Sequence, residues 1–360
     1  MSTDKQHYPQ VSWMERFKQV LDILQLPYYV VAGLFSDANK GRSWRRSASD
    51  SVMRFVSSRG WSIGMFGIKA GATSAIYETW TRKNGLEVLT DEIGEGAKLH
   101  WIGSRRYDRV LLYFHGGGLC FPVDADNQLG FLLALQRELQ QSTEGVGFVF
   151  LEHSFTPQFS FPTQLRQANA ALIHLLTNGV SPSRLLICGD SSGANLACQL
   201  FSHVLHPLPK ISPAPPLGTP FLGAVFISPW ISFTPPSSGQ KDLLAPQFFE
   251  FMAAQLLPGI EDAERPYVEP SIAGDAWWEG LGSVVTRILA TAGEVECQHD
   301  NIVRFVDGPV RKQVPHTTLV VEKNGVHEEM LFAFGAGEGG QSEEYWALVK
   351  WTSDAFNTAK

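Results

Sequence analysis

Short apolar runs alternate with longer amphipathic stretches through the middle of the chain. Each run is rich in Val, Ile, Leu and Phe, and a turn and then a helical pattern follow it. This alternation is typical of a mostly parallel sheet that helices cover on both faces, and it predicts an α/β fold. The predicted strands are Arg109–Phe114, Gly147–Leu151, Arg184–Cys188, Gly223–Ser228, Arg287–Thr291 and Thr317–Glu322. The predicted helices are Asp126–Leu139, Pro162–Thr177, Gly193–Leu205 and Pro246–Leu257.

The segments that flank and interrupt this alternation predict a lid. Two earlier runs, Leu86–Thr90 and Lys98–Ile102, are expected to form antiparallel strands that open the sheet. We therefore divide the chain into a helical lid segment at 1–84, a first part of the core at 85–233, a lid insertion at 234–282 and a last part of the core at 283–360.

The early apolar stretch Val20–Phe35 raises the question of membrane contact. It contains Asp22, Gln25 and Pro27, and it is too short to cross a bilayer as a clean helix. We expect a pair of lid helices rather than an anchor, and peripheral membrane contact stays open. The residues before Met14 are polar, which is not the pattern of a secretory signal.

Composition narrows the class of protein further. Of the 360 residues, 44% are hydrophobic and 18% are charged, and the net charge is −7. Lys and Arg are scattered, so we expect no nucleic-acid partner. We interpret the richest basic stretch, with Arg42, Arg45 and Arg46, as a solvated helix end or as lid salt bridges. Four widely spaced cysteines match neither a zinc motif nor a disulfide framework, so we expect an intracellular, cytoplasmic protein.

A glycine-flanked serine carries the first candidate chemistry. Gly189-Asp190-Ser191-Ser192-Gly193 matches the pattern Gly-x-Ser-x-Gly, in which small residues let a strand turn sharply into a helix and expose the serine hydroxyl. A predicted strand runs into the motif and a predicted helix leaves it. Ser191 is therefore the candidate nucleophile, and the alternative is a glycine-rich turn without chemistry.

A second motif, His115-Gly116-Gly117-Gly118, directly follows another predicted strand. Consecutive glycines free backbone N–H groups to face a developing oxyanion. The predicted elements between this motif and Ser191 are two helices and two strands, which brings both motifs to the same carboxyl edge of the sheet. A purely structural turn is the alternative.

The acid and the base that a serine nucleophile needs are expected later in the chain, in that order. Among the late histidines, His327 follows the last predicted strand, whereas His316 precedes it and so lies at its wrong end. His327 is thus the candidate base in preference to His299 and His316.

Three carboxylates follow the strand that ends near Thr291, at the edge where the sites of such sheets assemble. They are Glu294, Glu296 and Asp300. We favour Glu296 as the acid, and the alternative for each is a solvated surface carboxylate.

These motifs resemble the hormone-sensitive-lipase-like branch of the α/β-hydrolases, and most nearly its fungal esterase and steryl-acetyl-hydrolase-like members. The resemblance runs from about Glu78 to Val326. The motifs that carry it are His115–Gly118, Gly189–Gly193, Phe161-Pro162-Thr163 after Glu152–Pro157, Ser228-Pro229-Trp230, Thr291-Ala292-Gly293 with Glu296 and Asp300, and Gly325-Val326-His327. It implies an α/β-hydrolase fold with a mostly parallel central sheet, flanking helices and a helical lid.

In that family the oxyanion hole consists of backbone N–H groups that correspond here to Gly117, Gly118 and Ser192. The chain departs from the family at three places. Glu296 stands where many members have aspartate, His153 replaces the usual tyrosine, and Ser192 replaces a common alanine. Glutamate at 296 changes the geometry of the acid but keeps a carboxylate that can reach a histidine. The histidine at 153 brings a polar group near the acyl pocket that the resemblance implies.

The resemblance implies a serine esterase that forms an acyl-enzyme on Ser191, with His327 as base and Glu296 as acid. The expected substrate is a small-acyl ester of an apolar alcohol, and the mechanism requires no metal and no organic cofactor. Acyl transfer and a non-hydrolytic biosynthetic step remain as alternatives, and the oligomeric state is open. A small-ligand receptor is the alternative from another class, because the plant gibberellin receptor resembles this branch but has lost its catalytic histidine; His327 argues against it.

Overall fold

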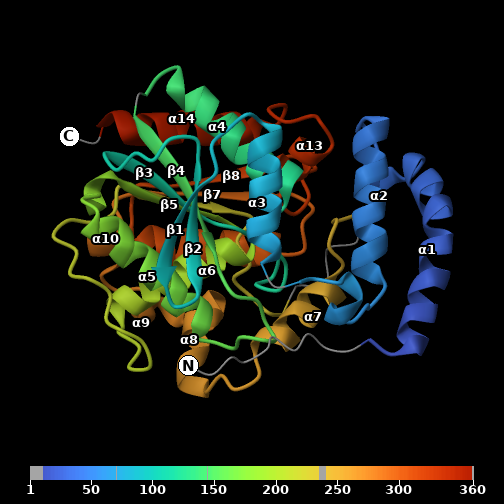
Figure 1. Ribbon diagram of the computed structural model, residues 1–360, viewed down its shortest axis with the longest axis horizontal. Coiled ribbons are helices and arrows are strands. Elements are labelled where there is room, and N and C mark those ends of the chain that lie inside the picture. The colour runs from blue at the N-terminus through green and yellow to red at the C-terminus, as the bar shows by residue number, and fades with distance from the viewer. Residues whose placement is uncertain (1–10, 70, 144, 235–240, 359–360) are drawn as a thin grey trace.

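A central sheet flanked by helices dominates the computed structural model, which describes residues 11–69, 71–143, 145–234 and 241–358 (Figure 1). Eight strands lie in the order β1-β2-β4-β3-β5-β6-β7-β8. Strands β3 to β8 pair in parallel, whereas β2 pairs antiparallel with β1 and β4. The bounds are β1 Leu89–Gly94, β2 Ala97–Ile102, β3 Arg109–Phe114, β4 Val146–Glu152, β5 Leu185–Asp190, β6 Gly223–Ile227, β7 Ile288–Gly293 and β8 Thr317–Glu322. The predicted α/β fold is confirmed.

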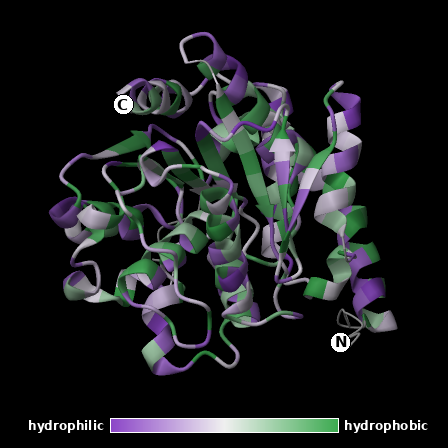
Figure 2. Ribbon diagram, turned by 60° about the vertical axis from the view of Figure 1, so that its left-hand side comes forward, coloured by the Kyte–Doolittle hydropathy of each residue, from purple (hydrophilic) through white to green (hydrophobic). Residues whose placement is uncertain are grey.

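The middle strands are buried along their length because helices cover both of their faces. Strands β5, β6 and β7 are completely buried, and Figure 2 shows the central strands coloured mostly as hydrophobic. Along β3, Val110 and Leu112 pack into a cluster with helices α5 and α6, while Leu111 and Tyr113 pack with α3, α4 and α14 on the opposite face. Such runs are typical of a parallel sheet between two helical layers.

The helices in the described residues range from single turns to six turns. Their bounds are α1 Trp13–Leu34, α2 Trp44–Ser58, α3 Ala72–Lys83, α4 Gly130–Gln140, α5 Thr163–Thr177, α6 Ser192–Leu205, α7 Pro246–Leu256, α8 Arg265–Val268, α9 Gly274–Trp277, α10 Leu281–Val284, α11 His299–Phe305, α12 Arg311–Gln313, α13 Glu329–Gly335 and α14 Glu343–Thr358. Helices α1 and α2 lie side by side at one side of the molecule, away from the sheet (Figure 1).

Two sequence predictions about the first elements are wrong. The segment expected to form a pair of lid helices is one helix, α1, which begins with a capping box between Ser12 and Glu15 and continues past Pro27. A proline removes one N–H bond from a helix but does not by itself end it. The first strand begins at Leu89 rather than Leu86, because the N–H of Leu86 donates to the Thr81 carbonyl, 3.0 Å away, in the turn that closes α3.

None of the helices in the described residues has both the length and the apolar content needed to cross a membrane. The lid segments differ in what they cover. Helix α7 lies between α2 and the carboxyl edge of the sheet, whereas α8 contacts α6. The candidate catalytic residues lie at this carboxyl edge, beneath α7.

Candidate active site

Ser191 lies on a sharp turn between β5 and α6. Its backbone has φ 46° and ψ −113°, which is a strained conformation for a residue with a side chain. The flanking glycine is required by space, because a Cβ atom at Gly193 would collide with the carbonyl group of Phe114 on the neighbouring strand. The turn at Ser191 and the lack of a side chain at Gly193 therefore place the Ser191 hydroxyl at the end of β5 and at the first turn of α6.

His327 approaches Ser191 from the loop after β8. Its Nε2 atom lies 2.9 Å from Ser191 Oγ, and both side chains are buried. The ring of Phe249, from α7, lies edge-on to the imidazole with centroids 5.2 Å apart. The structure thus brings together the predicted nucleophile and the predicted base at hydrogen-bond distance.

Glu296 lies on the other side of the imidazole. Its Oε2 atom is 3.5 Å from His327 Nδ1, which is long for a hydrogen bond, and it accepts a 2.7 Å hydrogen bond from the Ser228 hydroxyl. Both the Glu296 and the His327 side chains are completely buried. The Ser228 hydroxyl thereby orients the carboxylate toward the ring.

A carboxylate that the sequence analysis missed, Asp242, joins these loops. One of its oxygens accepts the backbone N–H of His327 and the other accepts the backbone N–H of Cys297, each at 2.8 Å. It also accepts the N–H of Leu243 at 2.7 Å. The residue lies in the lid insertion, far from both partners in the sequence, and no motif surrounds it. Only the tertiary arrangement reveals that it fixes the backbone on both sides of the acid and the base.

The two carboxylates shape the titration of the base. Burial lowers the pKa of His327, but Glu296 and Asp242 outweigh burial and raise this pKa above its usual value. Burial raises the pKa of Asp242, against the opposing effect of His327. Negative charge on both sides of the ring therefore favours the imidazolium that forms when a histidine accepts a proton from serine.

The glycine-rich loop after β3 lies against the turn that holds Ser191. Gly117 and Gly118 both have positive φ, 106° and 63°, and a Cβ atom at Gly118 would collide with Met252 of α7. The N–H of Leu119 donates to Ser192 Oγ at 3.1 Å, which ties the loop to α6. Ser192 is the first residue of α6, and the first N–H groups of a helix have no partner within it. The predicted oxyanion donors thus lie on two adjoining segments.

Asp190 connects the glycine-rich loop to the turn that holds Ser191. Its carboxylate accepts the Tyr113 hydroxyl, the Gly116 N–H at 2.8 Å and the Gln128 amide at 2.7 Å. Burial, and then the nearby Asp190, raises the pKa of Glu328 well above its usual range. Asp190, the residue before the candidate nucleophile, therefore has a structural part, because it fixes the glycine loop relative to Ser191.

His115 and His153 form a stacked pair beside the loop. Their ring centroids are 4.4 Å apart and the rings are 15° from parallel. The Nδ1 atom of His115 contacts the Gly116 carbonyl at 2.8 Å, and that of His153 contacts the Ser154 carbonyl at 3.0 Å. Burial lowers the pKa of both histidines. His153, which replaces the tyrosine usual in the family, therefore places a second neutral imidazole ring beside the glycine loop.

The other candidates lie elsewhere. Glu294 is exposed, and its side chain accepts the N–H of Asn324 at 2.8 Å. Asp300 is exposed on α11, and His316 is exposed before β8. His299 Nδ1 lies 3.1 Å from the Gly293 carbonyl. Within the described residues, none of these four side chains forms a hydrogen bond or an ion pair with Ser191 or His327.

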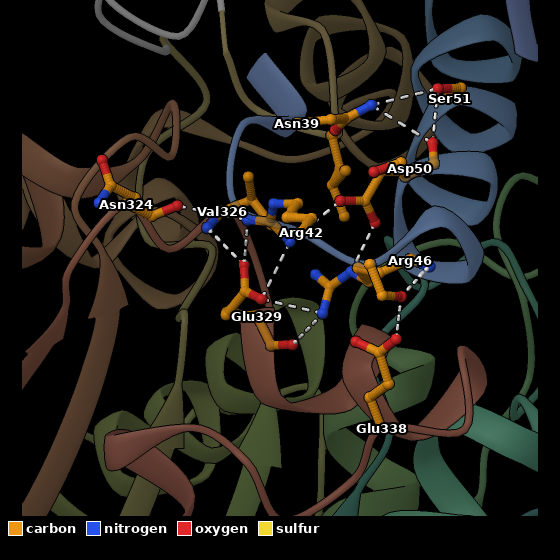
Figure 3. Close-up of polar contacts among 12 residues, drawn as sticks. Asn39, Arg42, Arg46, Asp50, Ser51, Asn324, Val326, Glu329 and Glu338 are labelled. Atoms are coloured by element: carbon orange, nitrogen blue, oxygen red, sulfur yellow. Dashed lines mark hydrogen bonds and ion pairs between the residues drawn. The ribbon is translucent and has the colours of Figure 1, made fainter. Parts of the chain in front are cut away.

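A buried ionic network connects α2 to the segment after His327 (Figure 3). Arg46 contacts Asp50 at 2.6 Å and Glu329 at 2.9 Å, and Arg42 contacts the same two carboxylates at 3.0 and 2.6 Å. Glu329 also accepts the N–H of Val326 at 3.1 Å. Within the basic stretch, which was interpreted as a solvated helix end or as lid salt bridges, Arg42 and Arg46 form salt bridges whereas Arg45 is exposed. The network links the start of α2 to the residues beside the candidate base.

Comparisons with known proteins identify the family and the fold. A sequence model described as alpha/beta hydrolase fold matches residues 111–331. The chain is 37% identical over 102 residues to arylacetamide deacetylase-like 2 of Homo sapiens, in an alignment that covers 27% of this chain and only 24% of that protein. It is 27% identical over 225 residues to an acetyl-hydrolase of Streptomyces hygroscopicus, which covers 60% of this chain and 67% of the relative.

Solved structures share the fold. An esterase from the bacterial hormone-sensitive lipase family superposes with a TM-score of 0.63 at 20% identity, and the match covers 89% of this chain and 100% of the other. Carboxyl esterase 2 of the mycorrhizal fungus Tuber melanosporum superposes with a TM-score of 0.57 at 18% identity, over 76% of this chain and 87% of the other.

Proposed function

The chain belongs to the α/β-hydrolase family, as its motifs predicted, and from this we propose that it is a serine carboxylic-ester hydrolase with Ser191 as its nucleophile. The observation that carries the proposal is the 2.9 Å approach of His327 Nε2 to Ser191 Oγ beside the glycine loop. The names of two relatives, arylacetamide deacetylase-like 2 and acetyl-hydrolase, support a deacetylase-like reaction.

In the proposed mechanism, Ser191 Oγ attacks the ester carbonyl carbon while its proton passes to His327 Nε2. The N–H groups of Gly117, Gly118 and Ser192 stabilise the oxyanion. His327 then gives the proton to the departing alcohol, which leaves an acyl group on Ser191. A water molecule, deprotonated by His327, attacks that acyl-enzyme and releases the carboxylic acid.

Glu296 has the proposed role of stabilising the imidazolium through Nδ1. The 3.5 Å separation is longer than a hydrogen bond, and hydrogen bonds of catalytic groups often shorten when substrate binds. Ser228 keeps the carboxylate oxygen on the side of the ring. We propose that Asp242 is a positioning residue, because it contacts the His327 backbone rather than the reacting atoms.

The substrate that we propose is a small-acyl ester of an apolar alcohol. The site is closed in this structure: Ser191 is only 3% exposed, and Phe249 and Met252 of α7 lie over His327 and Gly118. Two apolar side chains therefore lie over the base and the glycine loop, which favours an apolar substrate.

Hydrolysis of a p-nitrophenyl ester series from acetate to laurate tests the proposal. We expect turnover with the wild-type chain and its loss in Ser191→Ala. Turnover that persists in Ser191→Ala would exclude this nucleophile. Addition of an alcohol acceptor separates hydrolysis from acyl transfer, because a transferase would form the new ester in place of the free acid.

A further inference from the structure

The inward side of helix α1 carries polar residues as well as Leu26, which packs against the cluster of Phe55, Trp61 and Met65. The Gln19 amide donates to the Met65 carbonyl at 2.9 Å, and buried Asp22 accepts the indole N–H of Trp61 at 2.9 Å. Arg59 lies 3.8 Å from the same carboxylate. A surface helix of a globular protein normally buries its apolar side and exposes its polar one. Helix α1 instead leaves most of its large apolar side chains exposed, while polar contacts contribute to its inward side.

The outward side of α1 is an apolar stripe. At 100° per residue its members lie within about 80° of one another on the helix, over a length of about 27 Å. Each of these side chains is between 55% and 76% exposed, so the stripe does not pack against the rest of the protein. The stripe consists of Trp13, Phe17, Val20, Leu24, Tyr28 and Val31. An apolar surface of this length marks an interaction site.

The exposed charges around the stripe are mostly basic. Between residues 12 and 46 the exposed charged residues are Arg16, Lys18, Lys40 and Arg45, against the single acidic residue Asp37. The chain as a whole has a net charge of −7, so this region departs from the rest of the protein. At the start of α2, the guanidinium group of Arg45 lies 5.5 Å from the ring centroid of Trp44, which is also exposed.

We propose that this apolar stripe docks the protein on the surface of a membrane that contains anionic lipids, with α1 lying in the plane of the interface. Aromatic side chains with a polar end are suited to the headgroup region, and basic residues beside an apolar helix face attract anionic lipids. The same region of a second copy carries the same excess of basic residues, so its charge does not complement this one. The charge pattern therefore favours a lipid surface over a homodimer.

The docking does not depend on the proposed hydrolase activity, although the two fit together. Helix α1 packs on α2, and α2 contacts α7, whose Phe249 packs against the ring of His327. Docking through α1 would therefore hold the lid close to a lipid surface, where esters of apolar alcohols gather.

Flotation of the full chain with lipid vesicles tests the proposal. One set of vesicles is phosphatidylcholine alone, and the other contains phosphatidylserine at about one third, which raises the negative surface potential. We expect the protein to float with the anionic vesicles, and we expect the bound fraction to fall in high salt because salt screens surface charge. Ser191→Ala should float like the wild type, which separates docking from catalysis. Failure of the wild-type protein to float with anionic vesicles would overturn the proposal.

Variants of the stripe and of its charges sharpen the test. The triple substitution Phe17→Gln, Leu24→Gln, Tyr28→Gln should reduce vesicle binding by about ten-fold or more, because three apolar side chains leave the interface. Arg16→Glu with Lys40→Glu should remove the preference for anionic vesicles. The matched control is Ile272→Gln with Trp346→Gln, two exposed apolar residues outside α1, and it should bind like the wild type.

Two outcomes would contradict the proposal. One is vesicle binding by the triple variant that equals that of the wild type, with circular dichroism showing both folded. The other is a dimer in sedimentation velocity that the triple variant converts to a monomer, without vesicle binding by either protein. The second result would assign the stripe to a second copy of the chain.

Discussion

Of the two buried carboxylates near His327, Glu296 is the one whose substitution should affect catalysis most directly. Glu296 faces the ring nitrogen, so Glu296→Gln keeps the shape of the side chain but removes the charge that would stabilise the imidazolium. We expect kcat to fall strongly; loss of the corresponding carboxylate in a serine protease lowers it about 10⁴-fold. Steady-state kinetics with p-nitrophenyl acetate measures the effect.

Glu294→Gln is the matched control for this prediction, because Glu294 is exposed in the same loop. It should leave kcat nearly unchanged. The assignment of the acid fails if Glu296→Gln keeps more than about a tenth of the wild-type kcat while Glu294→Gln or Asp300→Asn abolishes it, since each tenfold change in rate corresponds to only about 1.4 kcal/mol.

The raised pKa of His327 predicts the acidic side of the pH profile. The base must be neutral to accept the Ser191 proton, so activity is lost as the pH falls through its pKa. Because Glu296 and Asp242 outweigh the effect of burial, we expect the midpoint of kcat/KM to lie above 6.5, the usual value for histidine. Glu296→Gln should move it to lower pH. A wild-type midpoint below 6.5 would mean that burial dominates instead.

The sequence predicted the residues whose chemistry depends on local geometry. Ser191 and the Gly116–Gly118 run could be found because a sharp turn and a close approach demand particular residue types at fixed spacing. His327 could be found from its place after the last strand. Asp242 could not, because its partners Cys297 and His327 are reached only through the fold and its own neighbours carry no pattern.

At the scale of elements, the network in Figure 3 makes α2 part of the support for the site. The Arg46 side chain is 3% exposed and Asp50 is completely buried. Arg46→Ala leaves two carboxylates with Arg42 alone, and breaking a buried ion pair by removing one partner destabilises a protein by about 3–5 kcal/mol. Urea unfolding should show a loss of this size in the free energy of unfolding.

Lys350→Ala provides the matched control for Arg46→Ala. Lys350 pairs with Asp354 on the exposed side of α14, with 79% and 60% of the two side chains exposed. Such a surface pair contributes about 0.5 kcal/mol or less. If Arg46→Ala destabilises the protein no more than Lys350→Ala does, the network has no special part in holding the lid.

The pattern of apolar residues predicted the bounds of strands better than it predicted the bounds of helices. The bounds of β3 and β8 are those predicted, because each is a short apolar or β-branched run between turns. The segment predicted as a pair of helices is the single helix α1, which begins with a capping box and continues through Pro27. Helix α14 was not predicted, although buried Tyr345, Leu348, Thr352 and Phe356 recur at helical spacing.

At the scale of the molecule, the two lid segments meet over the site. Helices α1 and α2 come from the start of the chain and α7 from the 234–282 segment, yet Arg54 of α2 donates to the carbonyls of Lys241 and Asp242, each at 2.9 Å. Asp242 in turn accepts the backbone N–H of His327. Hydrogen bonds therefore connect α2, through Asp242, to the backbone of the candidate base.

The contact of α7 with the glycine loop predicts how acyl length is limited. The buried side chain of Met252 lies directly against Gly118, so little space remains beside the proposed oxyanion donors. We expect the wild-type chain to have its highest kcat/KM on esters from acetate to hexanoate. Met252→Ala should raise kcat/KM for laurate relative to acetate by about ten-fold, because each additional buried methylene group is worth about 0.8 kcal/mol.

The control for this substitution is Glu250→Ala, on the exposed side of the same helix, which should leave the ratio of laurate to acetate unchanged. Thermal melts establish that both variants are folded at the assay temperature, since truncation of a buried methionine lowers stability. If the wild type prefers laurate, acyl length is not limited at Gly118. If Met252→Ala leaves the ratio where it was while remaining active, then α7 swings clear of the loop whenever substrate binds, and the closed arrangement does not determine specificity.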